Sequence, residues 1–396
     1  MTKRYCMVVH AYYPVGEVRV QREAEALLDE GYEVDVVCLR ILGELAVDSY
    51  HGVNVYRLPV RRHKKSGALI QLLEYLMFFV LAFFKLTVLH LWRRYDLVHV
   101  HTPPDYLVFV ALVPKLTGCP IILDIHDLMP EFFASRFGVN RNSLPVKLVY
   151  WEERLACRFA DHVITVTEHW RQSLIRRGVP ACECSVLMNV ADPRIFKRPA
   201  QTQLKLQGNH RFRLIYHGSI PQRYGLDLVL RAIARVRGAI PGIHFTIIGR
   251  GEYLDELLDL TTELGLEECV SFEKFMPVED LPAYIVTADL AVVPYRNDVF
   301  TDELLPTKLM EYAALGVPAI ASRTMGISAY FDDTMVQFFT PGDLDELAQC
   351  ILELYQDRSR LAKLACNITR FNDHYNWLDQ RASYLRLTDQ LIQGGS

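Results

Sequence analysis

The chain has 396 residues, of which 51% are hydrophobic and 23% are charged. At about 100–200 residues per domain this length predicts two or three domains, and the composition excludes an intrinsically disordered chain. The formal charge of 43 − 47 = −4 is too balanced for a dedicated nucleic-acid-binding protein, so we expect no nucleic-acid partner.

The N-terminal sequence MTKRYCMVVHAYYP runs directly into a predicted strand, without the long apolar region or cleavage site of a signal peptide. The nine cysteines are odd in number and scattered. Cys182 and Cys184 form the only close pair, and no second pair or histidine cluster follows at zinc spacing. We therefore expect a cytoplasmic chain without a disulfide framework or a bound metal.

The first half alternates short apolar runs with amphipathic stretches. The sequence VRVQREAEALLDEG, residues 18–31, places its apolar residues on one helical face and ends in a glycine, which predicts a helix. Apolar runs without clean alternation are typical of a parallel sheet that is covered on both faces. The predicted strands are Tyr5–His10, Glu33–Leu39, Val53–Leu58, Asp96–His101, Ile121–His126, His162–Thr167 and Ser185–Met188.

One segment, residues 61–94, has an apolar run close to the length of about 20 residues that a membrane-spanning helix needs. It contains Glu74, Lys85 and His90, and charges at a bilayer centre cost about 2.5–3.5 kcal/mol each, so we reject a span. Arginines and lysines flank both ends, and residues 1–195 carry 23 − 21 = +2 charges against 20 − 26 = −6 for the remainder. These features fit either a helix on an anionic membrane surface or a buried helix with a solvated basic loop.

A polar stretch with two prolines, Asn189–Asn209, predicts a linker, after which the alternation begins again. The tail Phe371–Leu391 predicts a helix that packs back across the first domain. We therefore predict two doubly wound α/β domains. The first comprises residues 1–195 with the C-terminal helix 372–396, and the second comprises residues 196–371. The second domain's predicted strands are Leu214–His217, His244–Ile248, Val270–Phe272, Leu290–Val293, Ala319–Ala321 and Val336–Phe339, and its predicted helices are Leu226–Val236, Tyr253–Leu264, Lys308–Leu315 and Leu344–Tyr355.

The stretch TDELLPTKLMEYAALGVPAIAS, residues 301–322, predicts a loop, a helix that starts near Thr307, and a strand. A helix N-terminus offers free N–H groups and partial positive charge to a diphosphate, and Lys308 adds a full charge there. Glu311, one turn later, can accept hydrogen bonds from both hydroxyls of a ribose. Glu303 lies in the preceding loop. Two glutamates eight positions apart also occur by chance as solvated residues.

The pattern E-x7-E (Glu303, Glu311) followed by A-x-G-x-P (Ala314, Gly316, Pro318) resembles the nucleotide-sugar site of retaining GT-B glycosyltransferases of the glycosyltransferase family 4 group. The resemblance covers most of the chain. It includes YHGSIPQRYGLDLVLRAI, FTIIGRGEYLDELLDL and VSFEKFMPVEDLPAYIVTADLAVVPY in the second half, and DLVHVHTPPD and ILDIHDLMPE in the first.

The resemblance implies a GT-B fold, with two Rossmann-like domains facing across a cleft and the donor held by the C-terminal one. Arg223 falls where the family carries a basic residue on the donor diphosphate, and Lys308 shares that task. Gly218 and Thr307 belong to the same donor-binding loops. Many members carry a cation directly after this glycine, where the present chain has Ser219, so the cationic clamp is incomplete or is completed by Lys308.

The resemblance also assigns the remaining site residues. Glu311 binds the ribose, and Glu303 contacts hydroxyls of the transferred sugar. His126 matches a histidine that the family aims at the sugar, although a hydrogen-bonded core histidine would give the same sequence. Gly16 is the single glycine of a first loop that is usually glycine-rich, and Asp127 and Glu131 are nearby polar candidates.

We therefore expect a metal-independent retaining glycosyltransferase that uses a UDP- or GDP-linked sugar and no separate cofactor. The acceptor is expected to be a lipid-linked saccharide in cell-surface polysaccharide synthesis. The 61–94 segment would place the enzyme on the inner face of the cytoplasmic membrane. Two alternatives stay open, namely a nucleotide-sugar epimerase of the same fold and a non-catalytic partner that only binds nucleotide-sugar or membrane.

Overall fold

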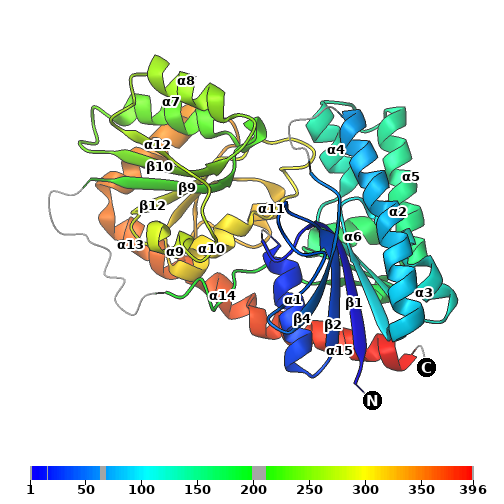
Figure 1. The fold of residues 1–396 in the computed structure, drawn as a ribbon. Coiled ribbons are helices and arrows are strands. Elements are labelled where there is room, and N and C mark those ends of the chain that lie inside the picture. Colours follow the sequence, from blue (N-terminus) through cyan, green and yellow to red (C-terminus); the bar gives the residue numbers. More distant parts are fainter. Residues whose placement is uncertain (1, 16, 63–67, 199–210, 395–396) are drawn as a thin grey trace. The chain divides into compact units, whose positions relative to one another are not determined.

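The computed structural model describes residues 2–15, 17–62, 68–198 and 211–394, and the chain divides into two compact units (Figure 1). The first unit comprises Met1–Asn189 and Leu378–Ser396, and the second comprises Val190–Trp377. The predicted boundaries at 195/196 and 371/372 are therefore corrected, because both flanking stretches belong to the second unit. There the Phe371 ring stacks on Phe331 with centroids 4.8 Å apart.

The sheet of the first unit has eight strands in the order β3-β4-β2-β1-β5-β6-β7-β8. All neighbours are parallel except β3, which pairs antiparallel with β4. Every predicted strand forms, and β3 is an addition that the sequence did not reveal because its residues are mostly exposed at the sheet edge. The strands are β1 Arg4–Tyr12, β2 Glu33–Leu39, β3 Val47–Tyr50, β4 Val53–Leu58, β5 Leu97–His101, β6 Ile121–Ile125, β7 His162–Thr165 and β8 Cys184–Val186.

The order reverses between β1 and β5, so the ligand crevice of this unit is expected at the carboxyl ends of these central strands. The predicted helix at residues 18–31 is confirmed as α1.

The basic residues Lys64 and Lys65 of the 61–94 segment lie outside the described residues. The helices of this unit are α1 Val18–Asp29, α2 Ala68–Arg93, the 3₁₀ helix η1 Asp105–Ala111, α3 Leu112–Leu116, α4 Met129–Phe137, α5 Leu144–Phe159, α6 Glu168–Arg176 and the 3₁₀ helix η2 Ala181–Glu183.

The sheet of the second unit is entirely parallel and has the strand order β11-β10-β9-β12-β13-β14. This order is the doubly wound arrangement, and it reverses between β9 and β12. All six predicted strands are confirmed. They are β9 Arg213–Ser219, β10 His244–Arg250, β11 Val270–Glu273, β12 Leu290–Val293, β13 Ala319–Ser322 and β14 Gln337–Phe339.

Helices cover both faces of this second sheet, with α7 and α8 on one side and α9 and α10 on the other (Figure 1). The apolar face of α7 is buried in one core together with α12 and α13. The helices of this unit are the 3₁₀ helix η3 Gln222–Tyr224, α7 Leu226–Val236, α8 Leu254–Glu263, α9 Leu281–Ile285, α10 Thr307–Leu315, α11 Met325–Ser328, α12 Leu344–Gln356, α13 Arg358–Asn367, the 3₁₀ helix η4 Ile368–Arg370 and α14 Phe371–His374.

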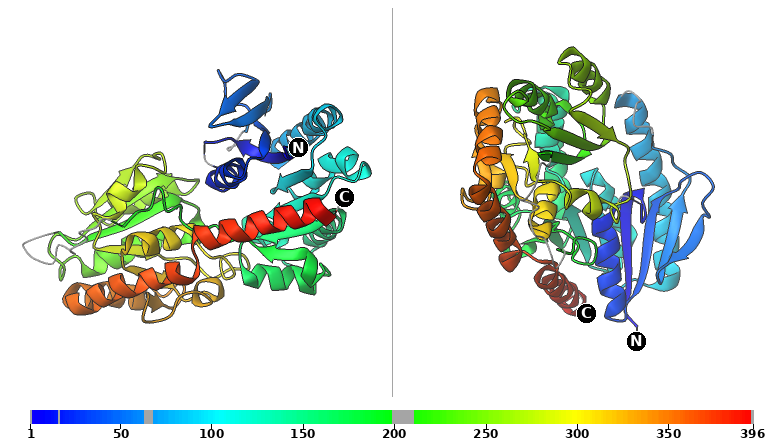
Figure 2. Two further views of the ribbon diagram at one scale, coloured as in Figure 1. Left: turned by 90° about the horizontal axis from the view of Figure 1, so that it is seen from below. Right: turned by 90° about the vertical axis from the view of Figure 1, so that its left-hand side faces the viewer.

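The last helix, α15 (Trp377–Gly394), returns the chain to the first unit and runs along it (red in Figure 2). Its anchor is Tyr384, which is 1% exposed. The Tyr384 hydroxyl donates a hydrogen bond to the Tyr5 hydroxyl at 3.0 Å and lies 3.3 Å from Nδ1 of His99. At the helix end, Lys3 pairs with Asp389. The helix is thus bound to β1 and β5 through buried polar contacts.

Replacing this anchor tests whether α15 is integral to the first unit. We expect Tyr384→Ala to lower the free energy of unfolding of that unit by about 3–5 kcal/mol, because a large buried ring leaves a cavity. Trp92, Trp151 and Trp170 lie in the first unit, so urea unfolding followed by tryptophan fluorescence reports the change. The control Leu378→Ala, at a position 73% exposed, should stay within about 0.5 kcal/mol. A loss below 1 kcal/mol in Tyr384→Ala would contradict the anchoring role.

Candidate functional site

The second unit gathers the predicted donor residues where β9 and α10 meet. Gly218, the penultimate residue of β9, has φ +115°, a conformation that favours glycine. A Cβ atom at Gly218 would lie 3.3 Å from Cε of Lys308, so a side chain there would crowd the lysine. The loop after β9 and the start of α10 therefore approach each other closely at the carboxyl edge of the sheet.

Lys308 is the most unusual charged residue of this region because it is only 6% exposed. Its Nζ donates a hydrogen bond to the hydroxyl of Tyr295 at 2.8 Å. The same atom lies 4.8, 4.9 and 5.1 Å from the ring centroids of Tyr216, Tyr224 and Tyr295. Burial lowers the pKa of Lys308 to about 7, and the nearby Glu311 opposes this shift only in part. The tyrosine rings hold an ammonium group that has lost most of its water.

Glu311 lies one turn further along α10 and pairs with Nε2 of His217 through its Oε2 atom. The other ring nitrogen of His217 lies 3.0 Å from the hydroxyl of Tyr312. The Glu311 side chain is 17% exposed. A carboxylate can accept about four hydrogen bonds, so this pairing orients Glu311 and still leaves it able to accept hydrogen bonds from a ligand.

Glu303 and Arg223 lie on the two loops beside this position. The Glu303 backbone is held by α11, since a Cβ atom at Gly326 would lie 2.6 Å from the Glu303 carbonyl carbon. Arg223, in η3, has its guanidinium carbon 5.6 Å from the ring centroids of both Tyr224 and Phe300. Arg223 thus connects the loop after β9 to the loop that carries Glu303.

The structure brings Gly218, Lys308 and Glu311 together at one edge of the sheet, with Thr307 exposed in the first turn of α10. Gly16, predicted for the first unit, lies outside the described residues. Sequence reasoning missed Tyr216, Tyr224 and Tyr295, the rings around Lys308. Tyr216 lies within β9, Tyr224 ends η3 and Tyr295 follows β12. They carry no spacing signal in the sequence, because only the fold brings them together around Lys308.

In the first unit, a cavity of about 270 Å³ opens at the carboxyl ends of β1, β5 and β6. This is the switch point of that sheet, where a ligand is expected to bind. The wall combines ring systems with charged groups, a mixture that suits a polyhydroxylated ligand. Residues on this wall include His10, Glu17, Arg62, Tyr75, His126 and Arg136.

His126 lies on this cavity wall directly after β6, as the sequence indicated. Its Nε2 atom lies 3.1 Å from Oδ2 of Asp124 and 3.2 Å from Nδ1 of His101. Burial alone would lower the pKa of His126, but the Asp124 carboxylate outweighs burial and raises it. The ring is thus held in one orientation beside the cavity, and its protonated form is favoured.

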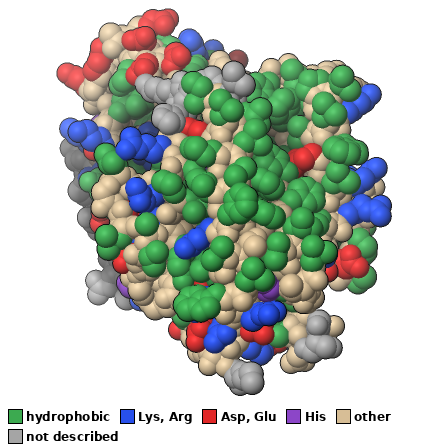
Figure 3. Space-filling model, turned by 45° about the vertical axis from the view of Figure 1, so that its right-hand side comes forward, with side chains coloured by type: hydrophobic (Ala, Val, Ile, Leu, Met, Phe, Trp, Pro, Cys, Tyr) green, Lys and Arg blue, Asp and Glu red, His purple; other side chains and the backbone are tan. Residues whose placement is uncertain are grey.

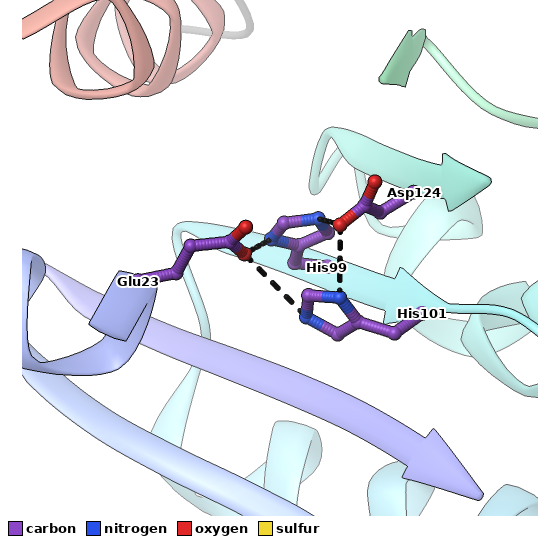
Figure 4. A group of neighbouring side chains, drawn as sticks. All are labelled: Glu23, His99, His101 and Asp124. Carbon is purple, nitrogen blue, oxygen red and sulfur yellow. Dashed lines mark hydrogen bonds and ion pairs between the residues drawn. The ribbon is translucent and has the colours of Figure 1, made fainter. Parts of the chain in front are cut away.

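Behind His126 lies a buried cluster of Glu23, His99, His101 and Asp124 (Figure 4). Their ligand atoms lie within 4.8 Å of one another, which raises the possibility of a metal site. The guanidinium of Arg19, however, donates to both oxygens of Asp124 at 2.7 and 2.9 Å and lies 3.1 Å from Glu23. Arg19 therefore supplies a fixed positive charge beside both carboxylates, and Asp124 links this charge to His126.

The electrostatics of this cluster follow from burial and from the Arg19 charge. Burial raises the pKa of Glu23 to about 7, while Arg19 limits the rise. Burial lowers the pKa of His101 to about 4, so this ring is neutral near pH 7. Burial would raise the pKa of Asp124, but Arg19 and the contacts with His126 and His101 outweigh burial and hold it well below its usual value.

Glu131, a sequence candidate, has a structural role instead. It is 1% exposed, and its Oε1 atom accepts hydrogen bonds from Arg177 at 2.7 Å, Tyr150 at 2.7 Å and Arg141 at 3.0 Å. These contacts join α4 to α5 and to the chain after α6. Asp127, the other nearby candidate, does lie on the cavity wall.

Comparison with known proteins gives matches in both units. Residues 16–189 match the family model "Glycosyl transferase 4-like domain", and residues 211–357 match "Glycosyl transferases group 1". The amylovoran biosynthesis glycosyltransferase AmsK of Erwinia amylovora is 26% identical over 54% of this chain and 53% of that protein, about half of each. A D-inositol 3-phosphate glycosyltransferase of Thermobispora bispora is 26% identical over 91% of this chain and 86% of its own length.

Among solved structures, HepE of Anabaena in complex with UDP superposes with a TM-score of 0.73 at 18% identity, covering 98% of this chain and 100% of that chain. At this identity the likeness establishes the fold alone. The first family model covers the strands β2 to β8 of the first unit, and the second covers all six strands of the second unit. The chain therefore belongs to the glycosyltransferase family 4 group of GT-B glycosyltransferases.

Proposed function

We propose that the protein is a retaining glycosyltransferase that moves a sugar from a UDP- or GDP-linked donor to a saccharide acceptor. The observation that carries the proposal is the buried Lys308 ammonium at the carboxyl edge of the second sheet. A cation kept from water at a helix N-terminus interacts strongly with an anion, because little solvent screens it. A departing nucleoside diphosphate gains negative charge in the transition state, so such a cation favours transfer.

Each donor residue then has a physical task. Lys308 and Arg223 bind the diphosphate, and Gly218 allows the diphosphate to approach the backbone closely. Thr307 presents the N–H groups of the first turn of α10. Glu311, held by His217, accepts hydrogen bonds from the ribose hydroxyls. Glu303 contacts hydroxyls of the transferred sugar. Ser219 leaves the first cation position of the family empty, and Lys308 takes over that charge.

The transfer step requires no strong base from the protein. The bond between the anomeric carbon and the β-phosphate oxygen breaks, and the acceptor oxygen forms its bond to that carbon on the same face. The acceptor proton passes to the departing phosphate oxygen. Two fixed cations stabilise the departing charge, so this proposal involves no metal ion and no cofactor beyond the donor.

The acceptor binds in the first unit, in the 270 Å³ cavity beside His126. The relatives named for amylovoran biosynthesis and for D-inositol 3-phosphate support an acceptor from polysaccharide or glycolipid synthesis. We place the acceptor on a lipid carrier, and the enzyme in the cytoplasm in peripheral contact with the anionic inner face of the membrane through residues 61–94. One end of this segment borders the cavity, since Arg62 and Tyr75 lie on its wall.

A thermal-shift panel tests the donor site. UDP, GDP, dTDP and ADP are compared in the presence of EDTA, and one uracil or guanine nucleotide is expected to raise the Tm by several degrees. A ligand present at about 100 times its Kd adds about 2.7 kcal/mol to the free energy of unfolding. Glu311→Ala should abolish the shift, and the exposed Glu256→Ala should retain it. If no nucleotide in the panel raises the Tm, the donor site is refuted. Conversion of the donor sugar in the absence of any acceptor would indicate an epimerase.

The pKa of Lys308 makes a second prediction. Below pH 7 the free protein already carries the charge, whereas above pH 7 the bound diphosphate must draw a proton onto the amine. Donor affinity should therefore fall as pH rises from 6 to 8.5. Calorimetry of UDP binding at pH 8 in buffers of different ionisation enthalpy should show proton uptake approaching one. Lys308→Met should abolish the uptake and weaken binding, and it should raise the Tm of the free protein because the buried charge is gone. A pH-independent affinity would contradict this role.

His126 provides the acceptor-side prediction. His126→Ala should lower kcat for transfer at least tenfold, since the variant loses an oriented group beside the cavity. The UDP-induced Tm shift should be unchanged, because the donor residues belong to the other unit. The matched control, His51→Ala, removes a histidine that is exposed in the same unit and should retain full activity. Equal activity in both variants would leave His126 as a core histidine only.

A further inference from the structure

The outer face of α2 is a continuous apolar surface. Ten large hydrophobic side chains along this helix are between 44% and 76% exposed. They recur at helical spacing, so they form a stripe along the length of the helix. The exposed side chains are Ile70, Leu72, Leu73, Leu76, Met77, Val80, Phe84, Val88, Leu91 and Trp92.

The polar residues of α2 all turn toward the protein. Glu74 is 5% exposed, and His90 is buried with its Nε2 atom 2.7 Å from the hydroxyl of Thr117. Lys85 is half-buried, with its Nζ 4.4 Å from the ring centroid of Tyr56. In the sequence these residues counted against a membrane span, and in the structure they do not interrupt the outer stripe.

A second helix, α5, has an exposed face that combines apolar and cationic side chains. Its exposed apolar residues are Leu144, Leu148, Trp151 and Leu155, which follow one another at intervals of three or four. Interleaved with them are three exposed cations, Lys147, Arg154 and Arg158. The acidic residues of α5, Glu152 and Glu153, are half-buried and buried. Within α5, all of which the structure describes, the exposed stripe therefore holds apolar and cationic groups without an acidic one.

The two helices pack against the same element of the first unit, the 3₁₀ helix η1, which fixes their positions. Figure 3 shows a face of the molecule on which hydrophobic side chains form a broad area with Lys and Arg along its edges. Two helices therefore contribute to one surface, one supplying apolar bulk and the other supplying charge as well.

We infer that the outer faces of α2 and α5 together form a membrane-docking surface, in which α2 enters the acyl boundary of the bilayer and α5 binds anionic lipid headgroups. The inference deepens the proposed membrane contact of residues 61–94, because it adds a second helix and assigns the lipid charge. Leucine and tryptophan alternating with lysine and arginine are the composition of helices that lie in the interface of anionic bilayers. Each cation near such a surface contributes about a fivefold gain in affinity.

Other arrangements fit the surface less well. In a transmembrane arrangement α2 would leave the unit, which would expose Phe78, Ala82 and Leu86, all now 0% exposed. A twofold symmetric dimer through α5 would bring Lys147, Arg154 and Arg158 against their own copies, which is electrostatically unfavourable. An anionic bilayer complements both the apolar stripe and the cations.

Vesicle co-sedimentation of the full chain tests the inference. We expect strong binding to phosphatidylcholine vesicles that contain 30% phosphatidylglycerol, weak binding to pure phosphatidylcholine, and a loss of binding at high salt. Lys147→Glu with Arg154→Glu should weaken binding to the anionic vesicles more than tenfold. The matched control, Arg231→Glu with Lys363→Glu, reverses two exposed cations of the second unit and should bind like the parent. A second variant, Phe84→Ser with Val88→Ser, should lose binding and keep the salt dependence of what remains.

Other results would overturn the inference. No binding to either vesicle, or equal binding by the α5 variant and its control, would exclude docking through α5. A parent protein that is dimeric in light scattering and becomes monomeric in either surface variant would assign the surface to a second copy of the chain. The UDP-induced Tm shift, measured on the same preparations, separates the two proposals. A retained shift without vesicle binding would refute docking alone, and a lost shift with vesicle binding would refute the donor site alone.

Discussion

The reversal of strand order at the centre of each sheet is the constraint on which the rest of the molecule depends. Where the order reverses, the connections on either side leave the sheet in opposite directions, and the carboxyl ends of the central strands stay uncovered. In the first unit this place lies between β1 and β5, and in the second between β9 and β12. The cavity beside His126 and the buried Lys308 both occur there. The strand order thus determines where in each unit a binding site can form.

Most of the fold could be predicted because hydrophobic runs report burial directly. All thirteen predicted strands form, and α10 begins one residue from the predicted position. The failures have two separate causes. The strand β3 is exposed, so it has no apolar signature, and the unit boundaries at 189/190 and 377/378 depend on contacts such as the Phe371–Phe331 stack between residues distant in sequence.

The sequence predicts which residue types form the candidate site. It does not predict what surrounds each of these side chains in the fold. The motif that contains Glu303, Lys308 and Glu311 could be read along the chain, because loop, helix and glycine follow one another. The environment of Lys308 could not, since the three tyrosines around it come from separate elements. Composition likewise counted Glu74 in α2 as a charge, whereas the fold turns it inward. A polar residue makes the outer face of a helix polar only if its side chain points outward, and the sequence does not give that direction.

The two units treat a buried cationic side chain in opposite ways. In the second unit burial lowers the pKa of Lys308 to about 7, and in the reaction we propose a bound diphosphate restores the charge. In the first unit the Asp124 carboxylate, which Arg19 fixes from the other side, outweighs burial and raises the pKa of His126. The lysine costs folding free energy because burial disfavours its charged form, whereas the histidine gains more from Asp124 than burial takes away. A group that destabilises the free protein and is relieved by its ligand provides differential binding, and only such binding can favour a transition state over the ground state. The buried charge of Lys308 is therefore explained better by the proposed transfer reaction than by the stability of the second unit.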